Sequence, residues 1–398
     1  MTKMYKLGIV FLLALGCVAC KPSANHSVIG EIEGLGNDTL YVEYFCASDV
    51  ETMLYDTLVA ANGKFLYDKL FDQTVLMTLT PKQCMEYDSL SGEVQSSKLK
   101  QINLIVEPEQ TIRVEGRLNP DHLSYKALGS DLMKDYSKIR ESTIALEIES
   151  ERIWREAEQM WAAKERGANI VDSIFGNLLN EAQDSDAKVN NLKLAYVKAH
   201  PQKMLSALYL TTQPLDTLGV YYETLTAEVK KSVFQGVLEV QYDKYLRMIK
   251  CKANEVKMVA GTPAPEFILK DLKGNDVSLS SIAMKNKYIV LDFWGSWCSW
   301  CIKGFPKMKT YYAKYANKVE FVGIACSDKE EVWKKAVDTY QLPWIQLING
   351  KNMCNDVTVL YGVQGFPTKF ILDKNLKIVD RIEGEDPLFY ERLDALLQ

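Results

Sequence analysis

The stretch "VLDFWGSWCSWCIKGFP", residues 290–306, places two cysteines three positions apart directly after an apolar, aromatic-rich run. Packing alone does not require two cysteines at that spacing. The strand pattern "YIVLDFW" ends just before the pair, and an amphipathic helix pattern begins at it. Three interpretations compete: a redox dithiol, half of a metal site, and a structural disulfide.

The position of Cys298 and Cys301 at this strand-to-helix junction favours the redox dithiol. Residues i and i+3 share a helix face, so the two sulfurs can come within bonding distance. Cys298 lies at the helix N-terminus, where free N–H groups and the positive end of the helix dipole stabilise a thiolate. We therefore expect Cys298 to be the nucleophile. Cys301, one turn further in and more buried, keeps its proton until it attacks a mixed disulfide.

The two other interpretations have less support in the sequence. A structural zinc ion normally takes four ligands, but there is no second CxxC, and His26, His122 and His200 all precede the pair. A disulfide between residues three apart closes a very small loop and stabilises little through chain entropy. We therefore expect no metal and no bound cofactor.

Two further residues near the pair are candidates for a role. Asp292 lies inside the apolar run, where a carboxylate is costly unless it is hydrogen-bonded or has a raised pKa. A raised-pKa carboxyl beneath the pair would accept the proton of Cys301 as a general base. The alternative is a strand-end aspartate that reaches solvent. Pro367, in "GFPTKFILD", follows Phe366 and forms either a cis bond in a tight turn or an ordinary trans bond that opens a strand.

The composition is that of a multidomain globular protein. The length of 398 residues suggests two to three domains, and 47% hydrophobic with 25% charged residues is close to the globular average. The net charge of -5 gives no electrostatic footprint for nucleic acid or for an anionic membrane surface.

The pattern along the chain changes twice and predicts three regions. Residues 28–118 alternate as short strands, which predicts a β-rich domain of the antiparallel sandwich or barrel type. Residues 130–258 have helical periodicity and predict a helical spacer domain. After the Pro/Gly-punctuated "AGTPAPEF", residues 261–398 alternate between strand and helix, which predicts an α/β domain with a mixed sheet flanked by helices.

Residues 261–398, about a third of the chain, resemble the thioredoxin fold, and within it the TlpA/ResA-like branch of envelope thiol-disulfide oxidoreductases. The motifs that carry the resemblance are "GTPAPEFIL", "FWGSWCSWC" with Pro306 in the following helix, and "VQGFPTKFILD". The resemblance implies that Asp292 is the buried aspartate of thioredoxin. It also implies that Pro367 is the cis-proline that faces Cys298 and Cys301.

Two positions depart from the pattern of that branch. The dipeptide between the cysteines is Ser299-Trp300, not Gly-Pro, Glu-Pro or Pro-His. Because this dipeptide tunes the potential, the direction of electron flow stays open among reductant, oxidant and isomerase. Gly304 stands where the ResA-like branch often has a glutamate.

The N-terminus resembles a bacterial lipoprotein signal. Lys3 and Lys6 precede an apolar run too short for a membrane-spanning helix of about 20 residues. Residues 1–19 are the expected signal peptide, with Cys20 (or Cys17) as the lipidated cysteine. An uncleaved membrane anchor is the alternative. The implied location is the cell envelope, facing the periplasm and tethered to a membrane.

The function that we expect is a membrane-tethered thiol-disulfide oxidoreductase, acting as a reductant. Its partners would be thiol- or disulfide-containing envelope proteins and a membrane redox partner. We expect Trp297, Trp300 and Phe366 to form an apolar rim for the substrate. A peroxiredoxin is one alternative, but that class has a Thr-x-x-Cys motif at its peroxidatic cysteine, and here Gly295 stands three positions before Cys298. An envelope binding lipoprotein with a secondary redox module is the other.

Five cysteines remain outside these roles, and an odd number leaves at least one free thiol or an intermolecular bond. A Cys46–Cys84 bridge is one pairing to test, and Cys326 is expected to be a core thiol or to lie near the active-site end of the sheet. The five are Cys46, Cys84, Cys251, Cys326 and Cys354.

Overall fold

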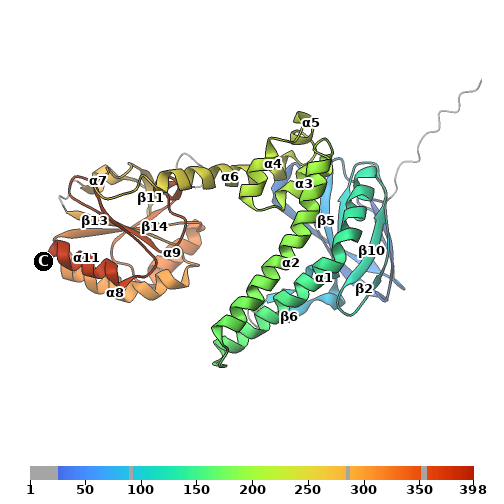
Figure 1. The fold of residues 1–398 in the computed structure, drawn as a ribbon, viewed down its shortest axis with the longest axis horizontal. Helices are drawn as coiled ribbons and strands as arrows, with labels where there is room; N and C mark the ends of the chain where they lie inside the picture. Colours follow the sequence, from blue (N-terminus) through green and yellow to red (C-terminus); the bar gives the residue numbers. More distant parts are fainter. Residues whose placement is uncertain (1–25, 89–92, 284–286, 351–355) are drawn as a thin grey trace, which may run out of the picture. The chain divides into compact units, whose positions relative to one another are not determined.

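The computed structural model describes residues 26–88, 93–283, 287–350 and 356–398. The chain divides into two compact units, Met1–Val240 and Gln241–Gln398, which Figure 1 draws in blue to green and in yellow to red. The expected signal peptide, both lipidation candidates and Cys354 lie outside the described residues.

The first unit contains two four-stranded sheets. One has the order β10-β9-β1-β4 and the other the order β3-β2-β5-β8. They are connected where the Tyr125 hydroxyl accepts a hydrogen bond from the Asn103 N–H at 2.8 Å. The strands are β1 (Val28–Glu33), β2 (Asp38–Cys46), β3 (Asp49–Ala60), β4 (Lys64–Tyr67), β5 (Val75–Pro81), β8 (Ile102–Val106), β9 (Ile112–Leu118) and β10 (Leu123–Leu128), with a separate hairpin of β6 (Glu86–Asp88) and β7 (Glu93–Gln95).

Alternation of apolar and polar residues forms these strands, as the sequence predicted. In β10, for example, Leu123, Tyr125 and Ala127 are buried while the residues between them are exposed. The expectation of a wholly antiparallel arrangement was wrong in one place, because β1 pairs with β9 in parallel. The strand β10 also extends the β-rich region beyond residue 118.

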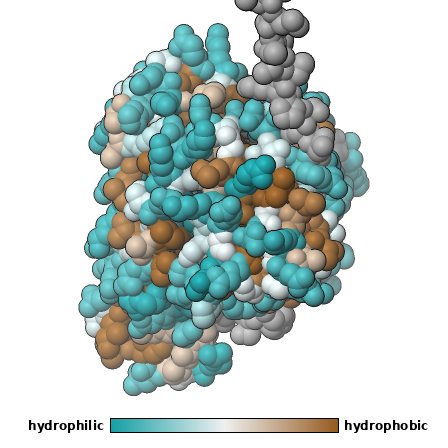
Figure 2. Space-filling model, turned by 90° about the vertical axis from the view of Figure 1, so that its right-hand side faces the viewer, coloured by the Kyte–Doolittle hydropathy of each residue, from teal (hydrophilic) through white to brown (hydrophobic). Residues whose placement is uncertain are grey.

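The edge strand β3 carries exposed apolar side chains on the surface of the first unit. Tyr55 and Val59 are more than two-thirds exposed, and Met53 and Leu54 are also exposed. Figure 2 shows apolar side chains among polar ones on the face that it draws.

Five helices follow the sheets within the first unit. The Ser130 hydroxyl caps α1 by accepting the Met133 N–H at 3.1 Å. Helices α1 and α2 lie along each other (Figure 1), and Trp154 donates to Asp186 between them at 2.9 Å. The helices are α1 (Asp131–Glu165), α2 (Asp172–Ala199), α3 (Met204–Thr211), α4 (Leu215–Tyr222) and α5 (Ala227–Lys230), and short 3-10 turns occur at Lys82–Cys84 and Lys98–Lys100.

The boundary between the units falls inside α6 (Gln235–Glu255), earlier than the expected break at residues 258–261. The C-terminal part of α6 is bound to the second unit by side-chain contacts. Arg247 pairs with Asp356, and the Asn254 amide donates to the Val359 carbonyl at 2.9 Å. These contacts make the C-terminal part of α6 a structural element of the second unit.

The second unit is a seven-stranded mixed sheet with helices on its faces, as predicted (Figure 1). The strand order is β12-β11-β15-β14-β13-β16-β17, with β13, β14 and β15 parallel and β16 antiparallel to β13. The strands are β11 (Ile268–Asp271), β12 (Asp276–Ser278), β13 (Tyr288–Trp294), β14 (Val319–Ala325), β15 (Ile345–Ile348), β16 (Thr368–Leu372) and β17 (Ile378–Glu383). The helices are α7 (Leu279–Ala283), α8 (Ser299–Tyr315), α9 (Glu330–Thr339), α10 (Val357–Leu360) and α11 (Pro387–Leu397).

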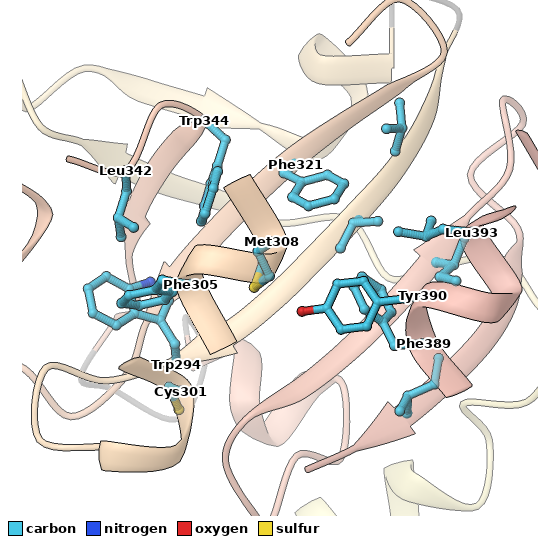
Figure 3. Close-up of a cluster of buried hydrophobic side chains, with 14 of the residues drawn as sticks. Trp294, Cys301, Phe305, Met308, Phe321, Leu342, Trp344, Phe389, Tyr390 and Leu393 are labelled. Atoms are coloured by element: carbon cyan, nitrogen blue, oxygen red, sulfur yellow. The ribbon is translucent and has the colours of Figure 1, made fainter. Parts of the chain in front are cut away.

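The inner strand β13, between β14 and β16, contributes to two core layers because successive side chains point to opposite faces. Val290 and Trp294 pack in the layer that contains both cysteines of the pair, together with residues of α8 and α11 (Figure 3). Leu291 and Phe293 pack in the layer on the other face. Asp292, between them, therefore points to the cysteine side of the sheet.

Candidate active site

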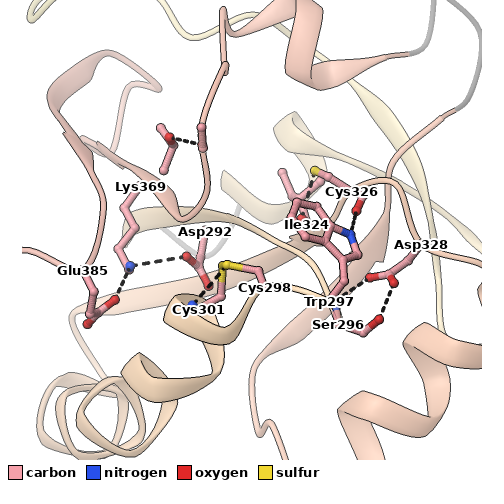
Figure 4. The surroundings of a disulfide bond; sticks show 12 residues. Asp292, Ser296, Trp297, Cys298, Cys301, Ile324, Cys326, Asp328, Lys369 and Glu385 are labelled. Atoms are coloured by element: carbon pink, nitrogen blue, oxygen red, sulfur yellow. Dashed lines mark hydrogen bonds and ion pairs between the residues drawn. A yellow bond between two sulfur atoms is a disulfide. The ribbon is translucent and has the colours of Figure 1, made fainter. Parts of the chain in front are cut away.

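Cys298 and Cys301 are joined in a disulfide at the start of α8 (Figure 4). Cys298 is the N-cap of the helix, and its Sγ accepts the backbone N–H of Cys301 at 3.2 Å. The exposed fractions are 6% for Cys298 and 2% for Cys301, so the pair lies just under the surface with Cys298 the less covered. The first sulfur is thus held where helix N–H groups stabilise negative charge.

The loop before the helix is fixed by the segment that follows β14. The Ser296 N–H donates to Asp328 at 2.9 Å, and the Ser296 hydroxyl donates to the same carboxylate. The Trp297 indole N–H donates to the Cys326 carbonyl at 3.1 Å. A Cβ on Gly295 would lie 2.5 Å from the Trp297 indole nitrogen, so a threonine there would displace this tryptophan.

Two of the three aromatic residues expected to form a rim meet at the surface. Trp297 and Phe366 pack edge to face, with ring centroids 5.4 Å apart. Trp300 is 63% exposed on the first turn of α8, and the Lys303 ammonium lies 4.7 Å from its ring centroid. The Phe366-Pro367 bond is cis, the first of the two conformations considered from the sequence. An apolar surface therefore adjoins the disulfide.

Asp292 is buried and does not reach solvent, with 1% of its surface exposed. Burial raises the pKa of Asp292 to about 6; the nearby Glu385 charge acts in the same direction, while Lys369 opposes it. A carboxyl with that pKa can accept and release a proton near neutral pH. Figure 4 draws Asp292, with Lys369 and Glu385, in the surroundings of the disulfide.

A buried lysine and a second carboxylate accompany Asp292, and the sequence reasoning missed both. Lys369 lies opposite Asp292 in the β13–β16 register, with its Nζ 3.7 Å from Asp292 Oδ1 and 2.8 Å from Glu385 Oε2. Lys369 is 1% exposed. The signal for Lys369 was a charged residue inside the apolar strand "TKFIL"; Glu385, in a polar turn, gave none.

The other described cysteines are free thiols. The Cys46–Cys84 bridge considered from the sequence is absent in the structure, where both thiols are free. Cys326 is fully buried, and burial raises the pKa of its thiol well above the usual value. Its backbone carbonyl nevertheless contributes to the active-site loop through Trp297.

Within the described ranges, no three His, Cys, Asp or Glu side chains gather in a way that could hold a metal ion. Among the same residues, no helix has the length and apolar character that crossing a membrane requires.

Comparison with known proteins places the similarity in the second unit. The model of the AhpC/TSA family matches residues 260–381. The thiol-disulfide oxidoreductase ResA of Bacillus thuringiensis is 35% identical over 148 residues, which are 37% of this chain and 81% of that protein. The thioredoxin-like protein YneN of Bacillus subtilis is 35% identical over 129 residues, covering 32% of this chain and 72% of that protein.

Solved structures resemble the same part of the chain. The thioredoxin domain of a thiol-disulfide oxidoreductase from Bacteroides vulgatus is 33% identical and covers 35% of this chain and 99% of that one, with a TM-score of 0.32. A thiol:disulfide interchange protein from a Bacteroides species is 33% identical, and the match covers 35% of this chain and 91% of that one, also with a TM-score of 0.32.

Proposed function

Since the chain belongs, through its C-terminal unit, to the ResA family of thiol-disulfide oxidoreductases, we propose that it reduces disulfides of cell-envelope proteins with its Cys298–Cys301 pair. The observation that carries this proposal is the position of Cys298, which caps α8 and is disulfide-bonded to Cys301. The chemistry at the pair needs no bound cofactor, because two thiols supply both electrons.

In the first step the Cys298 thiolate attacks one sulfur of a client disulfide. A Cys298–client mixed disulfide forms, and the other client sulfur leaves as a thiolate that takes a proton from solvent. The start of α8 supports this step because its N–H groups stabilise the attacking thiolate. The exposed rings of Trp297 and Trp300 would cover apolar parts of the client.

In the second step Cys301 loses its proton to Asp292 and attacks Cys298 Sγ. The Cys298–Cys301 disulfide forms and the second client sulfur leaves, so the client gains two electrons and the pair loses two. The buried position of Asp292 on the cysteine side of the sheet supports its role as the proton acceptor. A membrane redox partner would then return the pair to the dithiol.

We extend the proposal to the location of the protein. Lipidation at Cys20, or at Cys17, would tether the chain to a membrane with its oxidoreductase unit facing the periplasm. The support is the signal-like pattern of residues 1–19. Mass spectrometry of the N-terminal peptide, with Cys20→Ala and Cys17→Ala variants, tests this; an unmodified N-terminus in the membrane fraction would contradict it.

Trapping of clients tests the activity directly. The Cys301→Ser variant should accumulate mixed disulfides with envelope proteins, and the Cys298→Ser variant should accumulate none. The wild-type chain should reduce insulin when supplied with reductant, and peroxide consumption in the same assay measures the peroxidase alternative. A Cys301→Ser variant without adducts, together with inactive wild-type chain, would refute the proposal.

A second candidate function, ligand binding by the first unit, has the support of one cavity. The cavity has a volume of about 330 Å³, at the lower end of the range of about 300–1,000 Å³ for ligand sites. Its polar lining includes Arg140 and the Glu147–Lys193 pair, with N and O 3.6 Å apart. Native mass spectrometry of the chain purified from envelopes should show a bound small molecule. The Thr212→Trp variant, which fills the cavity from its wall, should lack that molecule. If the wild type and this variant carry the same bound species, the cavity is not the binding site.

A further inference from the structure

The proton acceptor Asp292 belongs to a three-member charge cluster that connects β13, β16 and the turn before α11. Lys369 lies between two carboxylates, 2.8 Å from Glu385 Oε2 and 3.7 Å from Asp292 Oδ1. The first distance is a charge-assisted hydrogen bond and the second is longer than a hydrogen bond. Asp292 Oδ1 has no hydrogen-bond partner within the described residues.

The position of Glu385 is determined by two contacts outside the cluster. The Tyr390 hydroxyl donates to Glu385 Oε1 at 2.8 Å, so one carboxylate oxygen binds the tyrosine and the other binds the lysine. The carboxylate also occupies the space beside Gly304 of α8, where a Cβ would lie 2.4 Å from Oε2. Gly304 follows Cys301 by three residues on the same helix face. A glycine at this point therefore admits Glu385 next to the resolving cysteine.

We propose that Glu385 is a positioning residue for the resolving step: it binds Lys369 and holds the ammonium away from Asp292, so that Asp292 can accept the proton of Cys301. The inference rests on the proposed function. Without Glu385, the buried ammonium would have Asp292 as its one carboxylate partner in the cluster and would pair with it fully. A carboxylate paired in that way is a poor proton acceptor because its charged form is stabilised.

The charges around Asp292 agree in sign with this assignment. Two carboxylates and one ammonium leave the ionised cluster with one net negative charge. The negative charge of Glu385 raises the pKa of Asp292 and the positive charge of Lys369 lowers it. The titratable groups that interact electrostatically with Asp292 are Lys369 from β16, Glu385 before α11, Tyr390 on α11 and Cys326 after β14. The Lys307 ammonium lies 4.1 Å from the Tyr390 ring centroid, and Cys301 belongs to the core layer on the same side of the sheet as Asp292.

The resolving step can be measured with 5,5′-dithiobis(2-nitrobenzoate) and the reduced full-length chain. Cys298 attacks the probe and releases one thionitrobenzoate; Cys301 then attacks Cys298 Sγ and releases the second. Stopped-flow absorbance gives the rate of the second release as a function of pH. The trace of the matched Cys301→Ser chain is subtracted, because it contains the reactions of the other thiols. Asp292→Asn identifies the limb of the pH profile that belongs to Asp292.

Three variants in different elements should shift the midpoint of that limb in stated directions. Glu385→Gln and Gly304→Ala should lower it by about one pH unit, the second because the new methyl group displaces the Glu385 carboxylate. Lys369→Met should raise it by about one unit or more. The matched control Glu391→Gln removes an exposed carboxylate of α11 and should leave it unchanged.

The outcomes separate this inference from the proposed function. A midpoint that stays constant or rises in both Glu385→Gln and Gly304→Ala would overturn the role of Glu385 while thiol exchange continues. If Lys369→Met does not fold, these two variants decide the matter alone. A profile in which Asp292→Asn removes no limb would also overturn the inference. A wild-type chain without a second release would refute the proposed function itself.

Discussion

Replacing Asp292 with asparagine should stabilise the oxidised protein at neutral pH and not in acid. Burial raises the pKa of Asp292 from 3.8 to about 6. At pH values between these two, the folded chain therefore keeps a proton on Asp292 that the unfolded chain has lost. Stability conferred by the protonated carboxyl is therefore complete below about pH 4 and lost as the pH rises through about 6. A shift of about two pKa units corresponds to about 3 kcal/mol. Asparagine has no proton to lose and avoids this penalty.

The assay is urea unfolding of the full-length oxidised chain, with both cysteines of the pair in the disulfide. Pulsed hydrogen exchange on peptides of β13 and β16 reads the second unit separately from the first. The free energy of unfolding of Asp292→Asn minus that of the wild type should grow by about 3 kcal/mol between about pH 4 and about pH 7. A difference that is the same at both pH values would show that Asp292 titrates like an exposed carboxyl and that burial does not raise its pKa.

Three further changes test the site and its support. Trp300→Ala should lower kcat/KM about tenfold for a protein disulfide but leave the reaction with 5,5′-dithiobis(2-nitrobenzoate) nearly unaffected, because this exposed ring on the first turn of α8 serves only a large substrate; equal losses for both would contradict this. Asp328→Ala removes both hydrogen bonds to Ser296 and should lower the free energy of unfolding of the second unit by about 1–3 kcal/mol in urea. Asp356→Ala removes the N-cap of α10 and one of the two carboxylates that pair with Arg247, which keeps Asp243, so the same measurement should fall by about 1–3 kcal/mol; a change below about 1 kcal/mol would argue against a contribution of that ion pair and cap.

The active-site core was accessible from the sequence because its signals are local. The strand-to-helix junction places Cys298, and the polar residue in an apolar strand marks Asp292, whose burial the structure shows. The Phe366-Pro367 motif was equally local, although only the structure distinguishes cis from trans.

The rest of the site depends on contacts between distant segments. Lys369 can be recognised as a site residue only from the β13–β16 register, which places it opposite Asp292. The sequence around Glu385 predicts a solvent-exposed turn. Nothing in that sequence indicates that the Glu385 side chain fills the space beside Gly304 of α8. The parallel β1–β9 pair was missed for the same reason, since strand partners far apart in the chain leave no local pattern. The use of α6 by both units was not visible in its helical periodicity.

The proposed thiol chemistry depends on a difference in ionisation between Cys298 and Cys301. Alkylation of the reduced chain by iodoacetamide across pH, with mass spectrometry of the two cysteines, measures it most directly. Cys298 should react with a midpoint at least about one pH unit below the free-cysteine pKa of about 8.5, and Cys301 with a midpoint above that value. Two midpoints near about 8.5, or a lower midpoint at Cys301, would contradict this expectation.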